Sequence, residues 1–319
     1  MYIYLPNSAF LGNIDPFLRS FDNTSPDRLE ISTNKQWISI HPVVLCMVAA
    51  LGLACKPENI VCQNIEAKSS HYLKRMKLFD LLGIKTTIEI VEHESAGRFI
   101  PLTQIAHSDQ LTTFIREMIP LLHLSAEEAE PIRYVVSELT RNVFEHARSS
   151  SGAIVCAQYY KKSNTIRIGI VDRGIGIRNS IAESHRVTSD GEAIRLALTP
   201  GITGTTNRLG GTEFNAGAGL FFIKSIAKVN KNFFMIYSGT SMFKLLKNAG
   251  KTMRLHGDPF KDNYAMQNNF PEWQGTVVGV DVNLDSREEF TDLLKLIRET
   301  FVKSVQEKKK AHYKKAQYI

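Results

Sequence analysis

The chain has 319 residues, 43% of them hydrophobic and 22% charged, and its formal net charge at pH 7 is +7. This length and composition exclude a disordered or fibrous chain and leave room for two domains with hydrophobic cores. The four cysteines form no Cys-x-x-Cys pair and have no histidine at zinc spacing, which excludes a disulfide framework or a zinc knuckle and favours a reducing cytoplasm as the location.

Residues 1–95 alternate short β-like runs with helical ones, which predicts a small α/β domain. The apolar run at 43–55 predicts a buried helix. It is the longest apolar run in the chain, yet it is too short to span a bilayer and too far from the N-terminus for a signal peptide, so no membrane association is expected. The other expected elements are strands at 2–5, 29–32, 36–40, 60–62 and 87–91 and a helix at 72–82.

The order of a strand, a buried helix, a short strand and an amphipathic helix over 37–83 resembles the STAS domain of anti-anti-sigma factors. The resemblance rests on pattern rather than on a chemical motif. The Asp-Ser-Ser-Gly phosphorylation loop of that family would fall where this chain has Ser39-Ile-His-Pro42, which argues against in-chain serine phosphorylation. His41 is expected to be a surface or capping histidine, with a role as phosphoryl acceptor left open.

Glu94-Ser-Ala-Gly-Arg98 is interpreted as a linker, because a glycine and small polar residues lie between apolar runs. A helix is expected at 110–122. Ser125-Ala-Glu-Glu128 fits a capping box that would start the next helix, with Pro131 bending that helix or marking a restart. We therefore predict one domain at 1–95, a second at 100–285, and a C-terminal helix with a lysine-rich tail at 286–319.

The helix expected from Pro131 to Ala147 carries the first candidate site residues. Glu138, Asn142 and Glu145 fall at i, i+4 and i+7 and form a polar stripe at the border of the buried face, whereas Arg141 is expected to face water. Such a stripe is most often the solvated shoulder of an amphipathic helix, and only the segments that follow favour a site. The apolar stripe beside it consists of Ile132, Val135, Val136, Leu139 and Val143.

Two segments at 153–160 and 165–171 predict a β-hairpin. The second strand runs directly into Asp172-Arg-Gly-Ile-Gly-Ile177, an acidic residue at a strand end followed by two glycines. A backbone without side chains at Gly174 and Gly176 allows a ligand to approach closely.

The glycine- and threonine-rich segment 199–216 follows, and Arg208 is the one positively charged residue in it. Gly217-Ala-Gly-Leu then opens an apolar helix, whose N-terminal N–H groups suit phosphate. Further on, strands are expected at 233–237, 241–246 and 275–283. Residues 247–273 are interpreted as a long polar insertion, because their apolar residues follow neither a helical nor a strand periodicity.

Glu-x-x-x-Asn on a helix, Asp-x-Gly-x-Gly after a strand and Gly-x-Gly-Leu opening a helix resemble the N, G1 and G2 boxes of the GHKL ATPase superfamily, which includes gyrase B, histidine kinases, MutL and the anti-sigma-factor serine kinases. The similarity covers about residues 105–285. The anti-sigma kinase branch is the most similar to the sequence of the first box, Glu138-Leu-Thr-Arg-Asn-Val-Phe-Glu-His-Ala147. The resemblance implies an α+β fold: a Bergerat-type α/β sandwich whose mixed, largely antiparallel sheet is covered by helices on one face.

The same resemblance implies ATP and Mg²⁺ as cofactors. Asn142 would offer an amide oxygen to the metal, Glu138 would orient or deprotonate the nucleophile, and Asp172 would accept a hydrogen bond from the adenine amine. Segment 199–216 would be the ATP lid. The other residues expected to contact the nucleotide are Gly174, Gly176, Arg208, Gly217, Gly219 and Thr276.

Several functions remain open from the sequence. The first is an ATP-hydrolysing or phosphate-transferring regulatory protein, such as a serine/threonine kinase acting on a STAS-like partner. The second is an ATP-gated protein-binding switch with negligible catalysis. A histidine kinase-like protein, with His107 or His123 as acceptor, and a nucleic-acid-associated ATPase are further alternatives. The last would use the tail, where six lysines and one glutamate fall within seventeen residues, although such a tail is usually a solvated, frayed end. A homodimer is left open.

Overall fold

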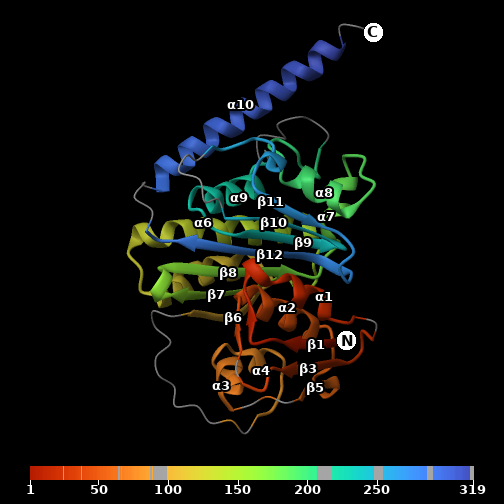
Figure 1. Ribbon diagram of the computed structural model, residues 1–319, viewed down its shortest axis with the longest axis vertical. Helices are drawn as coiled ribbons and strands as arrows, with labels where there is room; N and C mark the ends of the chain where they lie inside the picture. The colour runs from red at the N-terminus through yellow and green to blue at the C-terminus, as the bar shows by residue number, and fades with distance from the viewer. Residues whose placement is uncertain are drawn as a thin grey trace.

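The computed structural model places a large sheet across the middle of the molecule, with one group of helices above it and the N-terminal unit below it (Figure 1). Arg208, the linker at 94–98 and most of the strand expected at 87–91 lie outside the described residues. The structure describes residues 1–23, 25–36, 38–63, 65, 67–86, 88, 99–206, 217–247, 254–285 and 290–316.

The large sheet has seven strands in the order β11-β10-β9-β12-β8-β7-β6, and its neighbouring strands pair antiparallel. The hairpins predicted at 153–171 and 233–246 are confirmed as β7–β8 and β9–β10. The long strand β12 lies between β8 and β9, so it joins the two hairpins into one sheet. The strands are β6 Phe99–Ile105, β7 Ala153–Tyr160, β8 Thr165–Asp172, β9 Phe234–Gly239, β10 Ser241–Leu245, β11 Tyr264–Gln267 and β12 Trp273–Asn283.

Two segments predicted to be irregular are partly regular. The insertion at 247–273 contains edge strand β11 and a 3-10 turn at Pro259–Lys261, and Asp262 next to that turn is buried against Lys224 and Lys228. The lysine-rich end is helical as far as Ala316, because it continues a helix that is anchored on the protein by its first half. The expectation of a frayed tail is therefore wrong for residues up to 316.

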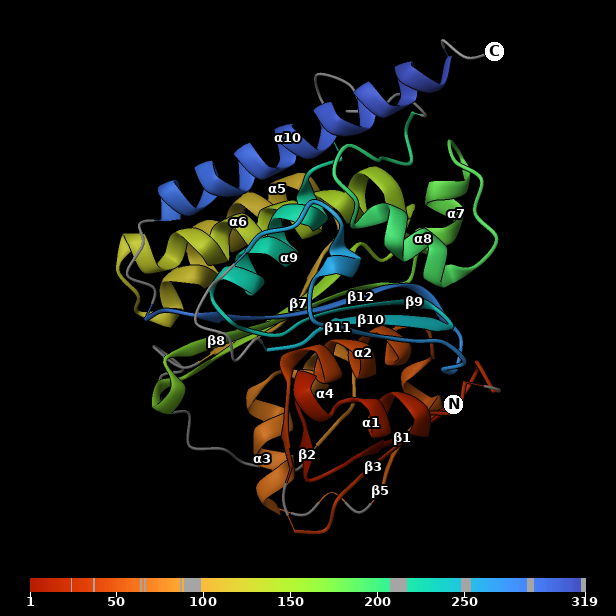
Figure 2. The same ribbon diagram turned by 45° about the horizontal axis from the view of Figure 1, so that its top comes forward.

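One face of the sheet is covered by helices that pack together over it (Figure 2). The central helix α6 starts at the predicted capping box, where the Ser125 hydroxyl accepts from the Glu128 N–H at 3.2 Å and the Glu128 carboxylate accepts from the Ser125 N–H at 2.9 Å. Its predicted apolar stripe is buried. The helices are α5 Ser108–Thr113, α6 Ala126–Asn142 continued by a π-helical turn at Val143–Ala147, α7 Gly176–Ala182, α8 Asp190–Ala197, α9 Gly219–Val229 and α10 Phe290–Ala316.

The N-terminal unit has a three-stranded parallel sheet in the order β1-β3-β5 and a short parallel pair, β2 with β4. Its elements agree with the predicted alternation, although the strand expected at 36–40 is regular only at 39–40 and the helix expected at 72–82 is two helices. The elements are β1 Tyr2–Leu5, β2 Ser8–Ala9, α1 Asp15–Ser20, β3 Leu29–Thr33, β4 Ser39–Ile40, α2 Pro42–Gly52, β5 Ile60–Gln63, α3 Ala67–Arg75 and α4 Leu78–Leu81.

The helices of residues 100–285 cover one face of the large sheet, as expected, and the buried helix α2 of the N-terminal unit covers the second face. It packs where Gly169 of β8 and Gly279 of β12 are paired across the strands. A Cβ at Gly169 would lie 2.4 Å from the backbone of Val43, and the Cys46 thiol donates to the Gly169 carbonyl at 3.3 Å. The two missing side chains therefore allow the helix to lie directly on the strands, and the N-terminal unit shares one core with the underside of the sheet.

His41 joins these two parts of the molecule. Its Nδ1 accepts from the Val43 N–H at 3.1 Å as the N-cap of α2, and its Nε2 donates to the Asp281 carboxylate at 3.1 Å. The expected capping role is confirmed, but the ring is fully buried rather than on the surface. Both nitrogens are engaged, so the ring has no free position for phosphoryl transfer.

Stability should fall at acid pH because of His41. Burial lowers its pKa below the ordinary 6.5, and this effect exceeds the opposing influence of Asp281. Below pH about 6.5 the unfolded chain therefore binds a proton that the folded chain does not. The stability present above that pH is lost as the pH falls, at about 1.4 kcal/mol per pH unit until the folded chain also binds the proton. Urea denaturation between pH 7.5 and 5 should show a smaller loss for His41→Asn than for the wild type. Equal slopes would contradict this role.

Candidate functional site

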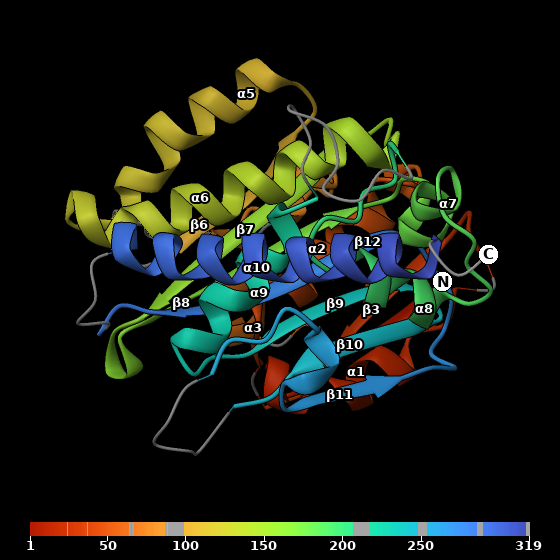
Figure 3. The ribbon, with the colours of Figure 1, turned by 90° about the horizontal axis from the view of Figure 1, so that it is seen from above.

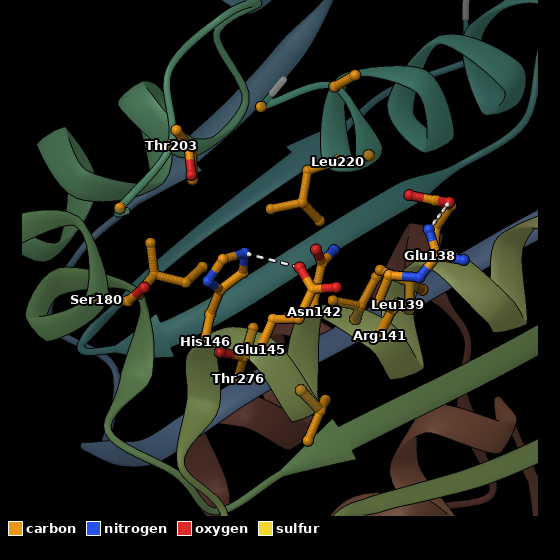
Figure 4. Close-up of a pocket in the computed structure, with 18 of the residues that line it drawn as sticks. Glu138, Leu139, Arg141, Asn142, Glu145, His146, Ser180, Thr203, Leu220 and Thr276 are labelled. Carbon is orange, nitrogen blue, oxygen red and sulfur yellow. Dashed lines mark hydrogen bonds and ion pairs between the residues drawn. The ribbon is translucent and has the colours of Figure 1, made fainter. Parts of the chain in front are cut away.

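A cavity of about 690 Å³ opens between α6, α7, the start of α9 and the ends of β8 and β12 (Figure 4). Its size is that of a typical pocket for a small organic ligand. Of the nine sequence-predicted site residues, seven line it: Glu138, Asn142, Asp172, Gly176, Gly217, Gly219 and Thr276.

The carboxylate of Glu138 and the amide of Asn142 project from successive turns of α6 toward the start of α9. A Cβ built on Gly219 would lie 3.0 Å from Glu138 Oε2 and 3.6 Å from Asn142 Nδ2. The first N–H groups of α9 therefore face a carboxylate and an amide across a space kept open by a glycine. A helix N-terminus is favourable for anions, so this end of the cavity suits phosphate.

Glu138 is held by Arg141, whose Nη1 lies 3.2 Å from Glu138 Oε1. Arg141 is exposed, as expected, and because residues three apart are neighbours on a helix its guanidinium also reaches back to the cavity wall. Burial raises the pKa of the Glu138 carboxyl above its ordinary value, Arg141 opposes this shift and Glu145 adds to it. A carboxylate with a raised pKa is a stronger base than an exposed one.

Asp172 ends β8 and is only 3% exposed. Its Oδ1 accepts from the Gly174 N–H at 2.8 Å, and its backbone carbonyl accepts from the Trp273 indole at 3.2 Å. Burial raises the pKa of this carboxyl to about 6, although hydrogen bonds from Gly174 and Thr276 lower it. Above that pH the cavity contains a buried carboxylate that can accept a further hydrogen bond from a ligand.

The predicted glycines have different local roles. Gly174 lies behind the cavity wall, where a Cβ would be 2.0 Å from the Ala147 carbonyl, so its missing side chain makes room for the end of the central helix. Gly176 and Gly217 line the cavity and have φ values of +77° and +62°. Arg208 lies outside the described residues.

The cavity thus combines a carboxylate and an amide on one helix, a second helix opened by glycine, and a buried aspartate at a strand end. Residues 103–230 match the histidine kinase-like ATPase domain. The match runs from β6 to the end of α9. A search of curated proteins found no match.

The match covers the three predicted boxes and stops before β12, which carries Thr276. It includes neither the N-terminal unit nor α10. The resemblances to the anti-sigma kinase branch and to the STAS domain therefore stay predictions. Among the described helices, none is both long enough and apolar enough to cross a membrane.

Several residues that line the cavity were not predicted from the sequence. His146 lies in the π-helical turn, with Nε2 3.8 Å from the Glu145 carboxylate, and it could have been found because it follows Asn142 by four residues. Tyr134 precedes Glu138 by the same spacing. No local pattern indicates the residues that α10 contributes from the far end of the chain: Arg298, Phe301 and Val302.

The side chains suit a magnesium ion shared with a nucleotide better than a metal bound by protein alone. Within the described residues, no three His, Cys, Asp or Glu side chains gather to form a metal site. Mg²⁺ keeps several waters and is commonly bound by one or two protein oxygens together with substrate phosphates. The Asn142 amide beside the start of α9 fits that requirement.

Substitutions at the two glycines of the third box should separate ligand binding from folding. Gly219 has a helical backbone, so Gly219→Val is expected to leave the thermal midpoint nearly unchanged while its side chain blocks the space before Glu138 and lowers ATP affinity by at least about tenfold. Gly217→Ala should lower the midpoint, because its left-handed backbone costs about 1–3 kcal/mol and its Cβ would lie 2.2 Å from the Ile202 carbonyl. Thermal melts and ATP titrations of both variants test this; unaltered ATP binding by Gly219→Val would contradict it.

Proposed function

We propose that this chain is a regulatory Mg-ATP-binding protein that hydrolyses ATP or transfers its terminal phosphate to a protein partner. One observation carries the proposal. Glu138 and Asn142 of α6 and Asp172 at the end of β8 border one cavity of nucleotide size. The match of residues 103–230 to an ATPase domain supports it independently.

The adenine end of the proposed complex lies at Asp172. Its carboxylate would accept a hydrogen bond from the exocyclic amine, and Thr276 beside it would fix the rotamer of that carboxylate through the hydrogen bond between the two residues. Gly176 leaves room for the base. The wall next to them is apolar and would cover the purine faces; it includes Ile170, Ile177, Ile181 and Val278.

The phosphate end lies between α6 and the start of α9. Asn142 would hold Mg²⁺ through its amide oxygen, and Gly217 and Gly219 would present backbone N–H groups to the phosphates. The metal, when bound, neutralises phosphate charge. These contacts position the phosphates but transfer no proton. The group that activates the nucleophile would therefore be Glu138, one turn before Asn142 on α6.

Glu138 would orient the nucleophile and take its proton. Its carboxylate borders the phosphate end, and because burial raises its pKa it is a stronger base than an exposed carboxylate. The nucleophile would be water in hydrolysis or a serine or threonine hydroxyl of the partner in transfer. The resemblance to anti-sigma kinases favours a STAS-like partner.

An ATP-gated switch with negligible catalysis is the second candidate. It is favoured by the contact between Lys308 of α10 and the carbonyl of Pro200, at the root of segment 199–216. A shift of Pro200 on nucleotide binding would be transmitted through this contact to α10, which forms an outer surface of the molecule (Figure 3). Such a protein would use ATP to change its surface rather than as a phosphate source.

Calorimetric titration with ATP and with a non-hydrolysable analogue, each with and without Mg²⁺, tests the proposal when phosphate release is measured on the same samples. Mg²⁺-dependent binding with phosphate release or transfer supports the enzyme. Binding with no turnover in the presence of the physiological partner supports the switch. Absence of binding by the folded protein would refute both.

A further inference from the structure

Helix α10 forms part of the cavity wall although it lies outside the segment that matches the ATPase domain. It runs along the molecule above α6 and α9 (Figure 3). Arg298, Phe301 and Val302 of this helix line the same cavity as Glu138 and Asn142. The described site is therefore completed by a segment about seventy residues beyond the end of the match.

The helix is anchored on both sides of the cavity. On the α6 side the rings of Phe290 and Tyr134 are 5.9 Å apart, and Ile297 is fully buried. On the far side the Lys308 amine donates to the Pro200 carbonyl at 3.2 Å. Arg298 lies between these anchors and directly follows Ile297, so its position along the cavity is determined by the packing of the helix.

Between the anchors, Phe301 packs against Phe221 and Phe222 of α9, with ring centroids 6.1 and 6.0 Å apart. These two phenylalanines follow Gly219 in the first turns of the helix that faces the phosphate end. The aromatic contact therefore holds α10 against the same helix whose N-terminus is open to the cavity.

The charges on the wall leave Arg298 available to a ligand. Arg141 lies 3.2 Å from Glu138 and His146 lies 3.8 Å from Glu145, so each already faces a carboxylate. For Arg298, no ion pair is formed with any carboxylate in the described part of the chain. A polyphosphate entering this cavity brings several negative charges, and a guanidinium is the side chain best suited to bind phosphate oxygens in a bidentate way.

Arg298 belongs to the Glu138 end of the cavity. The phenol of Tyr134, one turn before Glu138, is subject to the charges of both Glu138 and Arg298. In Figure 4, Asn142 lies between Glu138 and Thr276 in the view, and Thr276 is the residue beside Asp172. A nucleotide with its base at Asp172 would therefore extend its last phosphate toward Arg298.

We propose that Arg298 binds the terminal phosphate of ATP and so makes the site discriminate ATP from ADP. This inference rests on the proposed ATP-binding function. It assigns a ligand contact to α10, which lies outside the matched residues 103–230, and it explains why a basic residue is presented to the cavity from a helix held on both sides.

The test compares ATP and ADP binding, by calorimetry at physiological salt, among the wild type, Arg298→Ala, Arg298→Lys and the matched control Lys303→Ala. Lys303 is exposed on the same helix and does not line the cavity, so its loss removes one positive charge without the contact. Arg298→Ala is expected to weaken ATP binding by about 10- to 100-fold and ADP binding far less, with partial recovery in Arg298→Lys. Lys303→Ala should bind both as the wild type does.

Equal weakening of ATP and ADP by Arg298→Ala, no weakening, or an effect no larger than that of Lys303→Ala would overturn the inference. Failure of the wild type to bind either nucleotide would instead refute the proposed function together with this inference. The wild-type titration therefore tells the two failures apart. Because Arg298 is exposed, its replacement should leave the thermal midpoint unchanged, which a melt of each variant verifies.

Discussion

Asn142→Ala should abolish Mg²⁺-dependent ATP binding, whereas Glu138→Ala should retain binding and lose turnover. The two side chains are one helical turn apart and face the same open space before Gly219, yet their chemistry differs. An amide oxygen can hold a metal but takes no proton at neutral pH, whereas the carboxylate can act as a base. Removing a general base is expected to slow phosphate release or transfer by about 100-fold or more.

This pair of variants is measured by titration with ATP in the presence and absence of Mg²⁺ and by phosphate release on the same samples. Glu130→Ala is a suitable control, because Glu130 is an exposed carboxylate two turns earlier on α6 and does not line the cavity. Turnover by Glu138→Ala at the wild-type rate would remove Glu138 from the catalytic role. Metal-dependent binding retained by Asn142→Ala would remove Asn142 as the metal ligand.

Asp172→Asn should stabilise the ligand-free protein while weakening its affinity for ATP. The pKa of Asp172 is about 6 in the folded protein, above the ordinary 3.8. The stabilisation that a protonated carboxyl provides is therefore present below pH about 4 and is lost as the pH rises through about 6, which leaves a cost of up to about 3 kcal/mol at pH 7. Asparagine removes that charge and can still accept from the Gly174 N–H.

The affinity of the variant should fall because an amide oxygen is a weaker acceptor than a carboxylate for the adenine amine. Wild-type ATP affinity should also decline as the pH is lowered through about 6, where Asp172 becomes protonated, and the Asn variant should show little of this pH dependence. Thermal melts without ligand and titrations at pH 5.5 and 7.5 provide both readings. A lower melting temperature combined with unchanged affinity would show that Asp172 is structural.

The parts of the fold that were predictable are those determined by local periodicity. The apolar stripe of α6, its capping box at Ser125 and the hairpin of β7 and β8 each depend on residues close in sequence, and the structure has all three. The same holds for the site residues Glu138 and Asn142, since helical geometry alone puts them on one face. Asp172 could be anticipated because it ends a strand next to two glycines.

The parts that could not be predicted depend on contacts between distant segments. Nothing in the sequence around Gly169 or Gly279 indicates that the two are paired and covered by α2. Likewise, the lysines drew attention to the charge in the second half of α10. Arg298, for which we propose a phosphate contact, lies in the first half of that helix, and the contacts of Phe290 and Lys308 with distant residues hold the helix at the cavity. Packing that closes over a site is visible only in three dimensions.

A crystal structure of the protein with Mg²⁺ and a non-hydrolysable ATP analogue tests the central claim most directly. We predict a purine whose amine donates to the Asp172 carboxylate, phosphates at the start of α9, and a metal on the Asn142 amide oxygen. A nucleotide bound elsewhere, or a cavity that remains empty at saturating ligand, would contradict the assignment.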